Sequence, residues 1–93
     1  MLSQLPTDFN KVNKKDLDKE ILRAGMIAEL DAVSFYEQMA ALTQNKKIKA
    51  VLLDIAKEEK THTGEFQALL KEIDPEYTKE LEAGKKEVDK LTK

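Results

Sequence analysis

The segment IKAVLLDIAKEEKTHTGEFQALL, residues 48–70, decides the fold expected for this chain. Its apolar residues recur at alternating intervals of four and three, which aligns side chains along the stripe that a helix presents to neighbouring helices. The stripe comprises Ile48, Leu52, Ile55, Phe66 and Leu69. Glu59 and His62 fill the two remaining positions of the series. The segment therefore predicts a helix over about residues 46–72, with two ionisable side chains where burial is expected.

A second helix is predicted on the N-terminal side of this segment. Asn13 is a good N-cap, so this helix should run from about residue 14 to residue 42. The chain should then turn at residues 43–45, where Asn45 can cap the helix that follows. Residues 1–12 show no apolar periodicity and are expected to form an extended lead-in.

Two more apolar stripes have the same spacing. The stripe of the helix over residues 14–42 is interrupted once, by Glu29, and its apolar members are Leu22, Met26, Val33, Tyr36 and Ala40. Asp74 followed by Pro75 is typical of a helix start and predicts a third helix over residues 75–91. The stripe of that helix is Tyr77, Leu81, Gly84, Val88 and Leu91. We expect an all-α fold, a helical hairpin plus a short C-terminal helix.

The composition favours one small domain over residues 1–93 that associates with other chains. Hydrophobic residues make up 41% of the 93 residues and charged residues 37%, which suits amphipathic helices better than an independent core. The 16 basic and 18 acidic residues are interspersed, so we expect neither a nucleic-acid surface nor a membrane surface. No cysteine is present to form a disulfide, a thiolate metal site or a thiol nucleophile. Without an apolar leader or span, a cytoplasmic protein is expected.

Three polar residues on the stripes should meet at one height in the hairpin. If the two long helices fold back around Asn45, Glu29 lies 16 residues before the turn, and Glu59 and His62 lie 14 and 17 residues after it. A lone buried carboxylate is costly and must be paired, protonated or bound to a metal. Di-iron four-helix proteins take one Glu from each of two helices and a Glu-x-x-His pair from each of the other two. This chain has half of that set.

A half-set makes dimerisation part of the metal-site hypothesis. Two chains related by a two-fold axis would supply four carboxylates and two imidazoles, and the hairpins would complete a four-helix bundle. An oxygen- and nitrogen-rich shell suits Fe(II), and also Mn(II) or Zn(II). The alternative interpretation is an ordinary ion pair between His62 and a glutamate, because Glu-x-x-His is common on helices.

Two further polar residues are weaker candidates. Tyr36 lies two turns along the stripe from Glu29. Its side chain could pack in the core or support the ligands from beside the metal, and the sequence leaves both interpretations open. Asp31 lies off the stripe, and is read either as an exposed acid or as a weak cation site on the approach to the metal centre.

The segments IAELDAVSFYEQMA (27–40) and AKEEKTHTGEF (56–66), with DPE at 74–76, resemble the encapsulated ferritin-like proteins. The resemblance covers roughly residues 20–82. It implies a hairpin that dimerises into a ferritin-like bundle and assembles into an open ring, commonly a decamer. It also implies ferroxidase activity inside an encapsulin nanocompartment, whose shell protein stores the oxidised iron.

By position, the resemblance assigns Glu29, Glu59 and His62 of both subunits as ligands of a di-iron centre at the dimer interface. It places Tyr36 near that centre and Asp31 where the family has an acid on the metal's approach. Two departures weaken the assignment of Asp31. Position 28 is Ala, where some relatives have a second acid, and position 35 is Phe, where some have Trp.

The expected function is oxidation of Fe(II) to Fe(III). One alternative is a rubrerythrin-like peroxide reductase, for which this chain lacks the cysteines of a rubredoxin iron. Another is a non-enzymatic assembly module, with or without a structural metal. The ring size, the oxidant and the role of the third helix stay open. It also stays open whether the domain is a separate protein or is fused to the shell protein.

Overall fold

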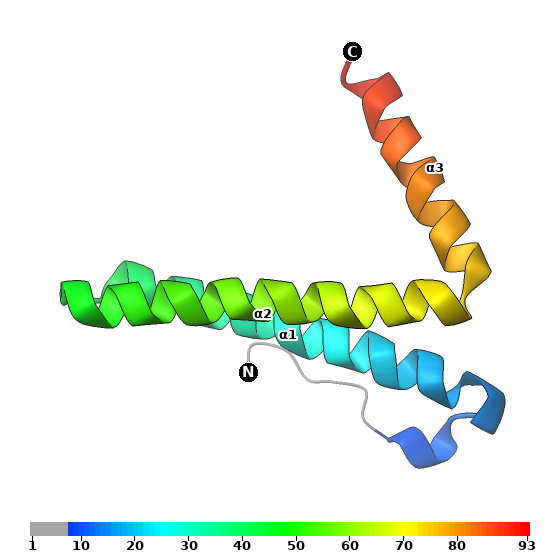
Figure 1. The fold of residues 1–93 in the computed structure, drawn as a ribbon, viewed down its shortest axis with the longest axis horizontal. Coiled ribbons are helices and arrows are strands. Elements are labelled where there is room, and N and C mark those ends of the chain that lie inside the picture. Colours follow the sequence, from blue (N-terminus) through cyan, green and yellow to red (C-terminus); the bar gives the residue numbers. More distant parts are fainter. Residues whose placement is uncertain (1–7) are drawn as a thin grey trace.

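The structure, a computed structural model, describes residues 8–93, and every regular element in this part of the chain is helical (Figure 1). Two short 3-10 turns, η1 (Phe9–Lys11) and η2 (Lys14–Asp16), precede three α-helices, which are α1 (Leu17–Leu42), α2 (Lys46–Ile73) and α3 (Pro75–Leu91). Helices α1 and α2 pack against each other as a hairpin, and α3 leaves the end of α2 steeply. The expected all-α fold is confirmed. Within residues 8–93, no helix is long and apolar enough to cross a membrane.

The two predicted helix caps are present. Asn45 Oδ1 accepts hydrogen bonds from the backbone N–H groups of Lys47 and Ile48, at 2.9 and 3.0 Å, which begins α2. Asp74 Oδ1 accepts from the N–H of Tyr77 at 3.2 Å, and Pro75 occupies the first position of α3. Each cap satisfies N–H groups that have no partner within the helix. The hairpin turn and the junction between α2 and α3 are therefore specified locally.

The N-terminal expectations need correction. Asn13 does accept a hydrogen bond from Lys15 N–H, but it caps the 3-10 turn η2, and the α-helix begins only at Leu17. The described end of the expected extended lead-in also forms a turn, η1, which lies against α1. Phe9 is half-buried there, and burial of an apolar ring favours the turn over an extended chain. Residues 1–7 of the lead-in lie outside the described residues.

The core between α1 and α2 is thin. Among the described residues, the buried apolar side chains are Val33, Ala40, Ala56 and Leu70. Several residues of the predicted stripes are instead open to solvent, among them Ile48 at 50% and Leu69 at 51%. Val33 and Ala40 belong to the α1 stripe, whereas Ala56 and Leu70 lie beside the α2 stripe, so the α2 stripe is the less covered of the two. Burial of the stripes within one chain is therefore incomplete.

The hairpin and α3 make a flat, open molecule with extents of 46 × 44 × 19 Å. The radius of gyration is 16.5 Å, against about 12 Å for a compact domain of this length. The accessible surface is 7385 Å², and a compact monomer of this mass has about 5,500 Å². The chain therefore exposes far more surface than a compact monomer of its mass.

The junction between α2 and α3 is held to α1 by a partly buried ion pair. Asp74 is 8% exposed, and its Oδ2 lies 3.3 Å from Nη2 of Arg23 on α1. Nη1 of the same arginine lies 2.8 Å from Glu20. Because Asp74 also caps α3, this contact ties the start of α3 to the hairpin. Beyond that start α3 extends away from its own hairpin, so Val88 and Leu91 stay exposed (Figure 1).

Candidate metal centre

Glu29, Glu59 and His62 converge at mid-height of the hairpin. His62 Nδ1 lies 3.5 Å from Glu29 Oε2 and 3.6 Å from Glu59 Oε2. One ligand atom from each of the three residues falls within 4.8 Å of the others. Within residues 8–93, these three side chains form the group of His, Asp or Glu residues that lie close enough together to hold one metal ion.

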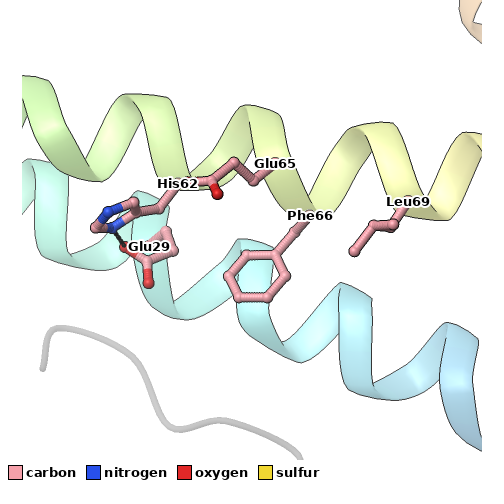
Figure 2. A pocket seen from close by; sticks show the side chains of 5 residues that line it. All are labelled: Glu29, His62, Glu65, Phe66 and Leu69. Atoms are coloured by element: carbon pink, nitrogen blue, oxygen red, sulfur yellow. Dashed lines mark ion pairs between the residues drawn. The ribbon is translucent and has the colours of Figure 1, made fainter.

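The helical geometry accounts for this convergence. Glu59 and His62 are three residues apart and share one face of α2. The antiparallel turn at Asn45 brings Glu29 of α1 to their level, as a rise of about 1.5 Å per residue on both helices requires. Figure 2 shows the Glu29 carboxylate pointing to the imidazole ring across the gap between the helices.

The donor set fits a metal ion. Two ligand atoms each about 2.1 Å from one ion lie about 3.4 Å apart at a tetrahedral angle, close to the distances found here. Glu29 Oε2 is buried and has no hydrogen-bond partner among the described residues. A buried carboxylate oxygen without a hydrogen bond is costly, and a bound cation would remove that cost. The arrangement therefore suits a cation better than an empty polar core.

The three side chains differ in exposure. The Glu29 and Glu59 side chains are 21% and 19% exposed, whereas His62 is 45% exposed. A groove of about 370 Å³ runs from Glu29 and His62 past Glu65 and Phe66 to Leu69 (Figure 2). The candidate site thus lies at the surface of the chain and opens outward on the α2 side.

The weaker candidates do not join this group. Tyr36 is half-buried, and its ring packs against Phe35 with the ring centroids 5.6 Å apart. Asp31 is only 9% exposed, so its interpretation as an exposed acid is wrong. An off-stripe position on a single helix predicts exposure, but the side chain of Asp31 is buried in the folded chain. Its role on a metal's approach stays a prediction.

A close contact beside the site was not anticipated from the sequence. The ring of Phe66 lies directly over Gly25 of α1, so closely that a Cβ at position 25 would be 3.0 Å from its Cζ. The stripe spacing predicted Phe66 as packing, but it did not single out Gly25. The available signal was a glycine inside a helix, where it costs about 1 kcal/mol relative to alanine and often marks a close approach.

Comparison with known proteins identifies the family. A family model described as rubrerythrin matches residues 20–93, a range that includes all three converging residues. The crystal structure of the encapsulated ferritin domain from Pyrococcus furiosus matches with a TM-score of 0.84 and 49% sequence identity, over 99% of this chain and 96% of that one. The chain belongs to the encapsulated ferritin-like branch of the rubrerythrin family. The family resemblance of its motifs is thereby confirmed.

Two curated relatives of this encapsulated ferritin-like chain are longer proteins. A ferritin-like–encapsulin shell fusion protein of Pyrococcus furiosus is 50% identical over 95 aligned positions, covering 99% of this chain. An encapsulin nanocompartment cargo protein of Myxococcus xanthus is 35% identical over 68 positions, covering 70% of this chain. The chain spans 27% of the length of the first and 52% of the second.

Proposed function

We propose that this encapsulated ferritin-like chain is a ferroxidase that oxidises Fe(II) at a di-iron site shared between two subunits. The observation that carries the proposal is the convergence of Glu29, Glu59 and His62. His62 Nδ1 lies 3.5 Å from Glu29 Oε2 and 3.6 Å from Glu59 Oε2, and Glu29 Oε2 is buried without a hydrogen-bond partner among the described residues. Oxygen and nitrogen donors of this kind suit Fe(II). Membership of the ferritin-like family supports iron as the metal.

Charge balance supports a site built from two chains. Two Fe(II) ions carry four positive charges, and one chain offers only the two carboxylates of Glu29 and Glu59. Two chains offer four carboxylates, which neutralise both ions, and two imidazoles to complete the ligand set. Oxidation adds one positive charge to each iron, and carboxylates stabilise that increase. The two electrons released would reduce dioxygen to hydrogen peroxide, or peroxide to water.

The exposed surface supports association through the face that bears His62. Apolar side chains on the same side of α2 are Ile48, Val51 and Leu69, all at least half exposed. The surface in excess of a compact monomer is about 1,900 Å² (7385 Å² less about 5,500 Å²), roughly twice the 800 Å² that one partner buries in a standard interface. That is enough for a dimer contact and a second contact in a larger ring.

We also propose that the oxidised iron passes to an encapsulin shell. The Myxococcus relative is named as an encapsulin nanocompartment cargo protein, and the Pyrococcus relative as a fusion with the shell. The chain would then work inside a nanocompartment, either as separate cargo or as a domain joined to the shell protein. The shell, not the helical bundle, would hold the mineral.

Iron stoichiometry and oxygen consumption test the proposal directly. Protein incubated anaerobically with Fe(II) and desalted should hold about one iron per chain, because two ions are shared by two chains. Admission of air should then convert this iron to Fe(III) while oxygen is consumed. Iron that binds but stays ferrous in air would favour a structural metal and contradict the ferroxidase proposal. Protein that binds no metal would favour an assembly module.

The rubrerythrin match supports a second candidate, a peroxide reductase. That reaction needs an electron donor, and these 93 residues contain no cysteine for a rubredoxin-type iron. Electrons would have to come from another protein or segment. Faster Fe(II) oxidation by hydrogen peroxide than by oxygen, with sustained turnover when an external reductant is supplied, would favour this candidate.

The outward course of α3 supports packing of its apolar stripe on another subunit. Val88 and Leu91 are 57% and 84% exposed, and α3 leaves its own hairpin (Figure 1). Val88→Glu should lower the oligomer mass measured by light scattering to that of a dimer, because a charge would be buried at the contact. Lys86→Glu, on the opposite face of α3, is the matched control and should leave the mass unchanged. An unchanged mass in Val88→Glu would contradict this packing.

A further inference from the structure

The contact between Phe66 and Gly25 is the closest approach that the structure records for a glycine of this chain. A Cβ at position 25 would lie 3.0 Å from Cζ of the ring and 3.1 Å from both Cε atoms. These distances are shorter than ordinary van der Waals contact, so even a methyl group would force the ring or the helix to move. Gly64 and Gly84 have nothing within 4 Å of the same position. Gly25 is therefore the glycine at which the absence of a side chain allows a close contact between the two helices.

The contact lies one helical turn from the candidate ligands on both helices. Gly25 precedes Glu29 by four residues on α1, and Phe66 follows His62 by four residues on α2. Because the helices are antiparallel, both steps lead in the same direction along the hairpin. Phe66 also lines the groove that Glu29 and His62 share, between those two residues and Leu69 (Figure 2).

This placement couples the contact to the spacing of the ligand atoms. If a side chain at position 25 displaced the ring toward the site, the ring would enter the space beside Glu29 and His62. If it displaced the ring toward Leu69, the ring would no longer line that space. If the ring stays, α1 must move away from α2 by a few tenths of an ångström. Helices transmit such shifts over one turn with little loss, and metal sites tolerate only about 0.5 Å of misplacement.

We propose that Phe66, seated on Gly25, is a positioning residue that sets the distance between Glu29 on α1 and the Glu59–His62 pair on α2. The inference rests on the proposed metal site and deepens it. The ring binds no metal itself. It acts as the spacer that holds the two helices at the separation the ligands need.

A rescue experiment tests this role, with Co(II) titrated anaerobically as an absorbing probe for Fe(II). Gly25→Ala adds a methyl group against the ring and should weaken Co(II) binding about tenfold, the lower range for losing an outer partner of a metal site. Its Co(II) absorption band should also change, because band shape depends on coordination geometry. Phe66→Leu should likewise weaken binding. The double variant Gly25→Ala/Phe66→Leu, in which a smaller side chain offsets the added methyl group, should regain affinity to within about threefold of wild type.

Gly64→Ala is the matched control, because it makes the same change on α2 where the added Cβ meets nothing. It should raise the melting temperature by roughly 4–8 °C through helix propensity, and leave Co(II) affinity and spectrum unchanged. Melting temperatures of all variants separate loss of folding from loss of positioning. Gly25→Ala that binds Co(II) like the control, or a double variant that binds no better than Gly25→Ala, overturns the proposal. Wild-type protein that binds no Co(II) would overturn the metal site as well, so the two failures are distinguishable.

Discussion

Alanine at position 59 or position 62 is expected to reduce oxygen-dependent Fe(II) oxidation to the rate of free iron in buffer. Each replacement removes one of the three donor atoms that lie within 4.8 Å of one another, and in the proposed site shared by two chains it would remove two ligands by symmetry. Loss of an outer partner of a metal ligand costs roughly 10- to 100-fold, and loss of a ligand itself should cost more. Initial rates of Fe(III) formation and oxygen uptake at equal protein concentration measure the effect.

Glu58→Ala is the control for Glu59→Ala. Glu58 is adjacent to Glu59, and its replacement by alanine removes the same charge. Its side chain is exposed and does not belong to the converging group. It should oxidise iron at the wild-type rate. Wild-type rates in Glu59→Ala or His62→Ala would contradict the assignment of these residues as ligands. Circular dichroism should show wild-type helicity in each variant, because removal of one half-buried polar side chain leaves the core between α1 and α2 intact.

Mixing of intact and inactive chains should reveal whether two subunits share one site. Equal amounts of wild-type and Glu59→Ala chains, unfolded and refolded together, should retain about one quarter of the wild-type activity per total chain, since one quarter of random dimers contain two intact chains. A site contained within each chain would leave about one half. The ratio is measured as initial rates of Fe(II) oxidation over a series of mixing fractions, and a shared site gives a quadratic dependence.

The same mixing with Glu58→Ala chains provides the reference. That mixture should retain full activity at every fraction, which shows that refolding together does no harm. A linear dependence with Glu59→Ala would contradict the shared site but not the assignment of Glu29, Glu59 and His62 as iron ligands. The experiment therefore tests the half-set hypothesis separately from the identity of the ligands.

The candidate site was predictable because periodic patterns on long helices are local and cumulative. Glu29, Glu59 and His62 each interrupt an apolar series, and their distances along the chain from Asn45 predicted a common height. The structure brings their ligand atoms together, and the caps at Asn45 and Asp74 are as predicted. Each of these features depends on residues within a few helical turns or on one turn of the chain.

The features that were wrong or missed depend on what lies across from a residue. Asp31 was placed on an outer face by its position on the helix, yet the folded chain covers it. The lead-in was expected to be extended, yet burial of Phe9 accompanies a turn at its described end. Gly25 was not singled out from the sequence, because its role in packing can be recognised only when the side chain that contacts it is known.

The sequence by itself determined the three helices, the turn between the first two and the three polar residues that interrupt the stripes, because helix periodicity and capping are local properties of the chain. The tertiary structure decided that those three side chains meet at an exposed surface of the chain, that Phe66 rests on Gly25 one turn away, and that α3 extends away from its own hairpin. Periodicity indicates that a stripe must be covered, but not by which helix. Only the packing of α1 on α2 shows which part of each stripe is still uncovered, and that part includes His62.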